Sequence, residues 1–295
     1  MHIPVLLKEV IEGLDFQDGD IYLDATLGNG GHMEAVAKIP NIRVSLMGID
    51  ADSSSIEIAK NRLSLSGIES KTAVLNFREM DKVLDLLDMK NPTKILFDLG
   101  WNSLQFEELG RGFSFQKDEP LIMSFKSDVS AEDITAYDVI NSWQEENLAD
   151  IIYGFGEEKY ARRIAKKIVE ARKIGPIQKT FQLVEIIKSA VPTFYKFSRL
   201  HPATKTFQAI RIAVNDELRS LQTGLEKAFS ILQKNGRMAV ISFHSLEDRI
   251  VKNFFKLKES EFGSEILNKK PIIAKEEEIE LNPRSRSAKL RIIKK

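Results

Sequence analysis

Four short apolar runs along the chain predict buried parallel strands. They are bounded by glycine, aspartate or asparagine, and they do not alternate between apolar and polar residues. Strands that are covered by helices on both faces have this character, whereas half-exposed strands alternate. The runs are Ile21–Asp24, Ser45–Asp50, Lys94–Leu99 and Arg237–Phe243.

Helical patterns lie between these runs. One follows the second run at Ser53–Leu63, and another precedes the fourth at Asn215–Leu232, before Gly236. Glycine at this place commonly ends a helix. Strands that alternate with helices predict a doubly wound α/β sheet.

The interval between the third and fourth strands is too long for a single crossover connection, so it predicts an insertion. One helical pattern in it covers Phe181–Val191 and ends at Pro192. Another places an apolar stripe on Ala161, Ile164, Ala165, Ile168 and Val169. We therefore predict a core of residues 1–105 and 201–295, with an inserted helical subdomain at residues 106–200.

Composition narrows the class of protein. The 295 residues include 43 Lys and Arg against 43 Asp and Glu, and there is no cysteine. The missing cysteines exclude disulfides, thiolate nucleophiles and zinc–thiolate or iron–sulfur sites. No apolar run is long enough for a membrane span, and no signal peptide is recognisable. We expect a cytoplasmic protein without a membrane partner.

Two clusters of basic residues stand out against the balanced total charge. One lies on the predicted helix after residue 160, and the other covers Arg284 to Lys295, which contains no acid. Solvated faces explain either cluster alone, but the two together favour a polyanionic partner. The first cluster is Arg162, Arg163, Lys166 and Lys167.

A glycine-rich segment follows the first predicted strand, with the sequence DATLGNGGH at residues 24–32. Such a turn brings backbone N–H groups close to a ligand, and Asp50, at the end of the second strand, can accept the hydroxyls of an adenosine ribose. Met33 replaces the third glycine of a dinucleotide fingerprint, and no P-loop Gly-Lys-Ser/Thr follows. The pattern therefore suits S-adenosylmethionine better than NAD. The alternative is a tight turn in which Asp50 only caps the next helix.

Polar residues further along the chain add to this site. Asp98 ends the third strand, and ligands of open α/β sheets lie beyond the carboxyl ends of strands. His244 and Ser245 are adjacent and lack a G-x-S-x-G elbow, which argues against a Ser/His/Asp hydrolase. The four histidines lack H-E-x-x-H spacing, so we expect no metal held by the protein.

Several motifs, in order along nearly the whole chain, resemble those of the RsmH (MraW) family of S-adenosylmethionine-dependent small-subunit rRNA methyltransferases. They are HIPVLL at 2–7, DATLGNGGH at 24–32, RGFSF at 111–115, GEEKYARRIA at 156–165, HPATKTFQAIRIAVNDEL at 201–218, ISFHSLEDRIVK at 241–252 and NPRSRSAKLR at 282–291.

The resemblance implies a Rossmann-like class I methyltransferase core with an inserted helical domain. It implies N4-methylation of a decoding-centre cytidine in 16S rRNA, within the small ribosomal subunit. The sequence leaves a homodimer open. The cofactor contacts that it implies, together with the loop, are Gly28, Gly30, Gly31, His32, Asp50, Phe77, Asp98 and Gln105.

Candidate residues for methyl transfer lie mainly at and after the end of the third predicted strand. The amine of cytidine must be held in line with the sulfonium methyl group, and Asp98, Asn102 and Ser103 are the predicted catalytic residues. His244 and Asn215 are weaker candidates, and Trp101 is a candidate for stacking on a flipped base. Predicted phosphate contacts are Arg111, Lys205, Arg284 and Arg286.

Two segments depart from the family pattern. Residues 98–105 read DLGWNSLQ where the family has DLGVSSPQ, and residues 120–126 read PLIMSFK where it has PLDMRMD. The alternative function is therefore a non-catalytic or re-specified ribosome-associated protein that binds S-adenosylmethionine.

Overall fold

The computed structural model describes residues 3–99, 110–126, 129–197 and 200–295. It divides into two compact units, Met1–Trp101 with Leu218–Lys295 and Asn102–Glu217. The second unit thus continues beyond the predicted boundary at residue 200. The reason is that α10 (Thr204–Asn215) packs against α6 (Ala136–Ser142) and α7 (Glu145–Gly154), and so belongs with the insert.

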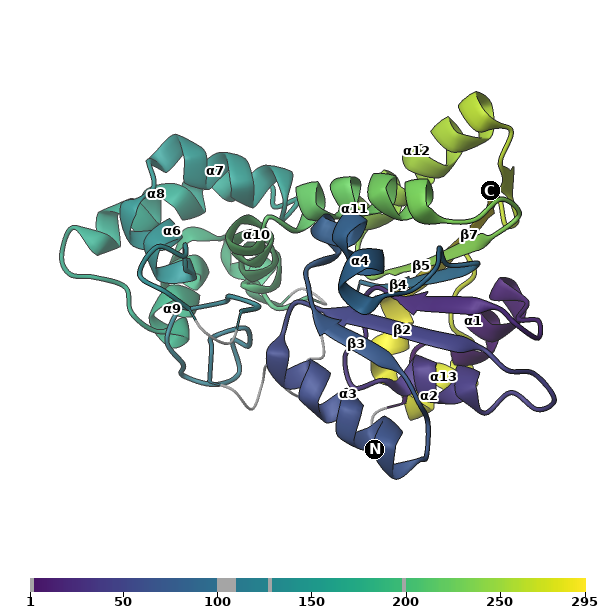
Figure 1. The fold of residues 1–295 in the computed structure, drawn as a ribbon. Coiled ribbons are helices and arrows are strands. Elements are labelled where there is room, and N and C mark those ends of the chain that lie inside the picture. The colour runs from purple at the N-terminus through teal and green to yellow at the C-terminus, as the bar shows by residue number, and fades with distance from the viewer. Residues whose placement is uncertain (1–2, 100–109, 127–128, 198–199) are drawn as a thin grey trace. The chain divides into compact units, whose positions relative to one another are not determined.

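The first unit contains a seven-stranded sheet with helices on both faces (Figure 1). Its strands, in the spatial order β3-β2-β1-β4-β5-β7-β6, confirm the predicted class I methyltransferase fold. β1 to β5 are parallel, and β7 pairs antiparallel with both β5 and β6. The strands are β1 (Ile21–Asp24), β2 (Ser45–Asp50), β3 (Lys71–Val74), β4 (Lys94–Asp98), β5 (Arg237–Ser242), β6 (Glu265–Ile266) and β7 (Lys289–Lys294).

Each face of the sheet carries its own apolar core because successive side chains of a strand point to opposite faces. Leu23 packs with α4, α11 and α12, whereas its neighbour Tyr22 packs with α1, α2 and α3. The helices of this unit are α1 (Leu7–Leu14), α2 (Gly31–Ala37), α3 (Ser53–Leu65), α4 (Val83–Leu87), α11 (Glu217–Ile231), α12 (Ser245–Phe262) and α13 (Glu276–Leu281), with 3-10 turns η1 (Phe77–Lys82) and η3 (Pro283–Ser287).

The strand order places a topological switch beside β1. The chain moves outward from β1 through β2 to β3, and then returns to the other side of β1 as β4. α2, which follows β1, packs on one face, and α11, which leads into β5, packs on the other. The carboxyl ends of β1 and β4 border the crevice in which such sheets bind ligands.

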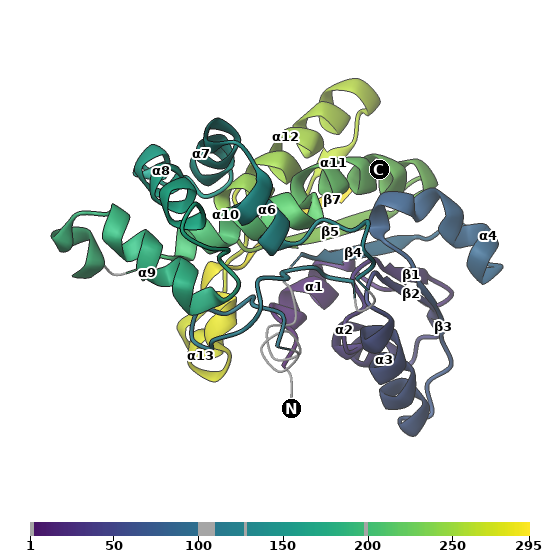
Figure 2. The same ribbon diagram turned by 90° about the vertical axis from the view of Figure 1, so that its left-hand side faces the viewer.

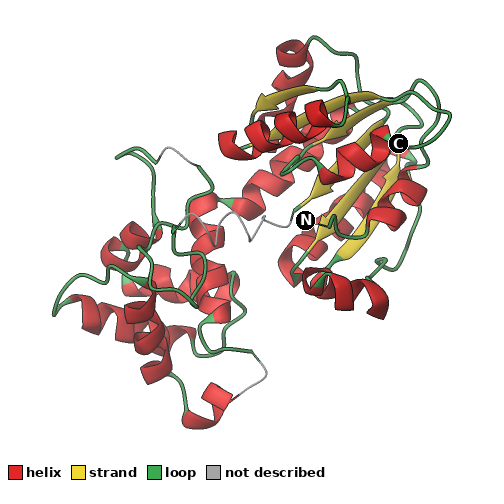
Figure 3. Ribbon diagram, turned by 90° about the horizontal axis from the view of Figure 1, so that it is seen from below, coloured by secondary structure: helices red, strands yellow, loops and turns green. Residues whose placement is uncertain are grey.

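Helices and loops make up the described part of the second unit (Figure 3). α7 packs on α8 (Ala161–Arg172), which in turn packs on α9 (Thr180–Ala190) (Figure 2). A 3-10 turn, η2 (Thr193–Phe197), follows α9. No described helix is both long enough and apolar enough to cross a membrane.

Candidate functional site

The loop after β1 is shaped by glycine. Gly28 and Gly30 have positive φ angles of 51° and 74°, and Gly30 is the N-cap of α2. A β-carbon on Gly30 would lie 3.3 Å from the Ala59 side chain, and one on Gly31 would lie 2.7 Å from Pro4. Among the described residues, only the Thr26 carbonyl lies within 4 Å of the corresponding position at Gly28. The loop is therefore packed against α3 on one side, and the described residues leave space beside Gly28.

Asp50 joins this loop to the end of β2. One carboxylate oxygen accepts a hydrogen bond from the Gly28 N–H at 2.8 Å, and the other accepts one from the Asp52 N–H at 2.9 Å. Burial raises the pKa of Asp50 to about 6. The Ala51 N–H is a further backbone donor to this carboxylate. Because an ionised carboxylate has about four acceptor sites, Asp50 still retains acceptor capacity toward a ligand.

Asp24, at the end of β1, is almost completely buried. It accepts hydrogen bonds from the Tyr22 hydroxyl at 3.1 Å and from the Thr26 N–H at 3.2 Å. Burial outweighs these bonds and raises its pKa to about 7. Asp24 therefore supports the loop from within the protein.

Replacing Asp24 with asparagine is expected to stabilise the protein at pH 8. The native carboxyl holds its proton more tightly than the unfolded one, so its stabilising contribution is present below pH 4 and is lost as pH rises through about 7. An amide avoids ionisation, so the gain in free energy of unfolding should be larger at pH 8 than at pH 5 by on the order of 2–3 kcal/mol. Urea unfolding at pH 8 and pH 5 measures it.

At pH 5 the advantage of Asp24→Asn should be smaller by about that amount, because the native carboxyl is then protonated and only the unfolded one is ionised, and it should vanish below pH 4. The exposed Asp85, changed to asparagine, provides a control with the same change of formal charge. An equal gain at both pH values would contradict the assigned titration.

Asp98 ends β4 next to the same loop. Its N–H donates to the Thr26 hydroxyl at 2.6 Å, and one carboxylate oxygen lies 3.8 Å from Nδ1 of His32. Nε2 of the buried His32 donates to the carbonyl of Val5 at 3.0 Å, which orients the ring. Thr26, which sequence reasoning missed, thus positions the predicted catalytic carboxylate. Its place in the Asp-Ala-Thr sequence after a strand is the only signal for it.

Phe77 lies in the segment that follows β3. The Leu75 N–H donates to the Asp50 carbonyl at 2.9 Å, which holds the start of this segment beside β2. The Phe77 ring meets Phe97 edge to face, with centroids 5.7 Å apart. A β-carbon on Gly224 would lie 2.6 Å from this ring, so Gly224 provides its space. The sequence did not reveal this role of Gly224.

Several predicted residues lie outside the described residues. These are Trp101, Asn102, Ser103 and Gln105.

The predicted phosphate contacts have different surroundings. Arg111 is buried, and its guanidinium donates to the carbonyls of Ser124 and Lys126 at 3.4 and 3.0 Å, so this geometry does not favour an RNA contact. Nζ of Lys205 donates to the backbone carbonyl of Glu157 at 2.8 Å. A carbonyl carries no formal charge, so this contact does not neutralise the lysine. The remaining two, on η3, are Arg284, half-buried, and Arg286, exposed.

The basic segment at the carboxyl end of the sequence is partly structural, so not all of the charge that favoured a polyanionic partner is available for one. Arg291, in the middle of β7, is buried, and its Nε donates to the Asp248 carboxylate at 2.7 Å. Nζ of Lys295 donates to carbonyls at the end of α11, including that of Leu232 at 2.7 Å. These two cationic side chains therefore form hydrogen bonds within the first unit.

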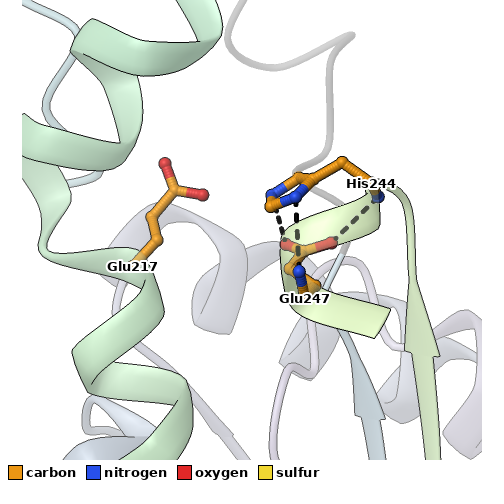
Figure 4. Close-up of side chains that lie close together, drawn as sticks. All are labelled: Glu217, His244 and Glu247. Atoms are coloured by element: carbon orange, nitrogen blue, oxygen red, sulfur yellow. Dashed lines mark hydrogen bonds and ion pairs between the residues drawn. The ribbon is translucent and has the colours of Figure 1, made fainter. Parts of the chain in front are cut away.

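The weaker candidates have local structural roles. His244 is the N-cap of α12, where its side chain accepts from the Glu247 N–H and Glu247 accepts from the His244 N–H (Figure 4). This reciprocal pair is a capping box. In the second unit, the Asn215 amide donates to the Met123 carbonyl at 2.7 Å and accepts from the Phe125 N–H at 2.8 Å. Asn215 thus holds the divergent segment 121–126 in place.

The first unit fits an adenosyl cofactor. The oxygen Oδ1 of Asn29, within the glycine-rich loop, is buried and has no hydrogen-bond partner in the described residues. Near it, the described residues leave space beside Gly28, and Asp50 adds acceptor capacity. These groups suit a ligand that carries hydroxyls and polar hydrogens, and no described group here forms a pyrophosphate cradle.

Comparison with known proteins agrees with this geometry. The model of the MraW methylase family matches residues 1–295. The chain belongs to this family. The ribosomal RNA small subunit methyltransferase H of Sulfurihydrogenibium sp. (strain YO3AOP1) is 47% identical over 292 residues, which cover 99% of this chain and 98% of that protein. The protein of the same name from Clostridium botulinum (strain Kyoto / Type A2) is 45% identical over 311 residues, covering 100% and 98%.

Among solved structures, this MraW family member is similar to an rRNA methylase from Streptococcus thermophilus. That similarity has a TM-score of 0.46 at 11% identity and covers 98% of this chain and 93% of the other.

Proposed function

We propose that this protein transfers a methyl group from S-adenosylmethionine to N4 of a decoding-centre cytidine in 16S rRNA, cytidine 1402 in the conventional numbering. The observation that carries the proposal is the family match over the whole chain, with relatives of 44–47% identity that are named ribosomal RNA small subunit methyltransferase H. Small-subunit rRNA as substrate rests on these names. The choice of N4 and of this cytidine rests on the resemblance of the sequence motifs to those of the RsmH (MraW) family.

Different residues of the first unit would bind different parts of the cofactor. Asp50 would accept the ribose hydroxyls, and the loop from Gly28 to Gly31 would approach the cofactor through its backbone. Phe77 would pack beside the adenine. The cofactor supplies the methyl group on a sulfonium, which makes the carbon electrophilic.

Asp98 is our candidate for orienting the reacting amine or the cofactor's ammonium group. The N4 amine of cytidine is a weak nucleophile because its lone pair is delocalised into the ring. Transfer therefore depends on holding the nitrogen in line with the methyl group, and a fixed carboxylate can accept an amine hydrogen bond. The bond from its N–H to Thr26 fixes the backbone of Asp98 for this purpose.

The test is a methyl-transfer assay with small subunits that lack the N4 methyl group. Purified protein is incubated with them and with labelled S-adenosylmethionine, and the labelled nucleosides are mapped by mass spectrometry. We expect label on N4 of the decoding-centre cytidine. Label on another nucleotide would overturn the assigned target. Absence of label with intact binding of S-adenosylhomocysteine would favour the non-catalytic alternative.

A further inference from the structure

Two aromatic side chains of η2 are unusually exposed. Phe194 retains 68% and Phe197 84% of their accessible surface. Residues three apart in a 3-10 helix lie on the same side of it, so the two rings occupy one surface. Packing of the second unit does not explain them, because neither ring is buried in its core.

Two tyrosines and a buried glutamate lie next to these rings and are linked by hydrogen bonds. Tyr195 meets Tyr160 edge to face, with centroids 5.0 Å apart. The Tyr195 hydroxyl donates to the fully buried Glu158 at 2.6 Å, and the other oxygen of Glu158 accepts from the Tyr160 N–H at 2.9 Å. Glu158 therefore links η2, through Tyr195, to the backbone of Tyr160.

Two basic side chains lie near three of these aromatic rings. Nζ of Lys159 lies 5.1 Å from the centroid of Tyr160, 5.3 Å from that of Tyr195 and 6.0 Å from that of Phe194. The Arg163 guanidinium lies 5.8 Å from the Tyr160 centroid. We call this set, Lys159, Tyr160, Arg163, Phe194, Tyr195 and Phe197, the aromatic–basic surface.

The exposed face of α8 extends this surface with further positive charge. Arg162, Arg163 and Lys166 are exposed, and none of them forms an ion pair with a carboxylate in the part of the chain that the structure describes. Two of these cations lie in the first turn of α8, near the positive end of the helix dipole, where a cation is unfavourable. Their placement does not serve the stability of the helix.

We propose that the aromatic–basic surface binds unpaired bases of the RNA substrate, with Phe194 and Phe197 as stacking platforms and the cations of α8 on the phosphates. Every unpaired base has a face that can stack on an aromatic ring, whereas a duplex hides these faces. The neighbouring cations complement a polyanion, which favours RNA over an uncharged apolar partner. This inference rests on the proposed function, because it assumes an RNA substrate.

The test compares two fluorescent probes of equal charge, a single-stranded oligoadenylate and an abasic oligonucleotide of the same length. The double variant F194A/F197A should bind the oligoadenylate at least about 10-fold more weakly, because each stacked base contributes substantially to affinity. Its binding of the abasic probe should be unchanged. The variant F194W/F197W should restore binding of the oligoadenylate.

Phe181 offers a matched control. It is also an exposed phenylalanine, at 46%, but it lies in the first turn of α9 whereas η2 follows the end of that helix. F181A should therefore bind both probes like the wild type. The triple variant R162Q/R163Q/K166Q should weaken binding of both probes and flatten its dependence on salt concentration.

Unchanged binding of the oligoadenylate by F194A/F197A would overturn the inference, as would an equal loss for both probes. The first of these results would favour a protein partner as the ligand of the exposed rings. Methyl transfer to small subunits, measured separately, distinguishes this failure from failure of the proposed function. A wild type that binds oligoadenylate through Phe194 but transfers no methyl group would retain the inference and refute the activity.

Discussion

Changing Asp98 to asparagine is expected to lower methyl transfer by about 10²- to 10³-fold. A carboxylate that accepts a hydrogen bond from the reacting amine acts mainly in the transition state, and positioned proton acceptors typically contribute effects of this size. The backbone N–H of Asp98 donates to Thr26, so the variant keeps this bond and loses only the charge and acceptor capacity of the side chain. Single-turnover methyl transfer to unmethylated small subunits measures the effect.

Affinity for S-adenosylhomocysteine separates the two roles considered for Asp98. If the carboxylate orients the amine, the dissociation constant of this product should change little while turnover falls. If it holds the cofactor's ammonium group, both should change together. Asp85→Asn is the control. Wild-type turnover in Asp98→Asn would remove Asp98 from the mechanism.

Changing Asp50 to asparagine is expected to weaken binding of S-adenosylhomocysteine by about 100-fold or more. The two oxygens of Asp50 accept from the N–H groups of Gly28 and Asp52. An amide places its NH₂ group against one of these donors, which leaves a buried donor unpaired, and it removes the charge-assisted bonds that we propose to the ribose hydroxyls. Isothermal titration calorimetry measures the loss.

The pH dependence of this binding gives a second test of Asp50. Its pKa of about 6 predicts that wild-type affinity decreases as pH falls below 6, because a protonated carboxyl has fewer acceptor sites. The variant Asp50→Asn should lack this decrease, and Asp85→Asn should retain it. A wild-type affinity that is constant between pH 5 and pH 8 would contradict a ribose contact by an ionised Asp50.

The sequence predicted the parallel part of the sheet well because its strands are continuous apolar runs. Runs of this kind at Ser45–Asp50 and Lys94–Leu99 correspond to β2 and β4 within one residue. β3 was missed because Lys71–Val74 is short and only half-buried. β7 was missed because its sequence, KLRIIK, was interpreted by its charges, although Arg291 is neutralised by Asp248.

Local motifs predicted the conformation of the glycine-rich loop better than they predicted the insert. This conformation depends on residues close in sequence, such as Gly28 and Gly30, whose positive φ angles glycine readily adopts. Arg111 is different, because its burial depends on the carbonyls of a segment that folds back on it. A sequence pattern cannot distinguish an arginine that binds phosphate from one that holds a loop together.

The position of β7, next to one edge strand of the sheet, has a consequence for the order in which the protein folds during synthesis. β7 lies between β5 and β6, and the first unit combines residues up to 101 with residues from 218 onward. The ribosome must therefore synthesise the whole insert and residues 289–294 before all strands of this sheet can pair. The helical insert has its segments close together along the chain and is made earlier, so it can fold first. Until β7 emerges, the edge of β5 stays unpaired, and the nascent chain depends on protection from aggregation during that interval.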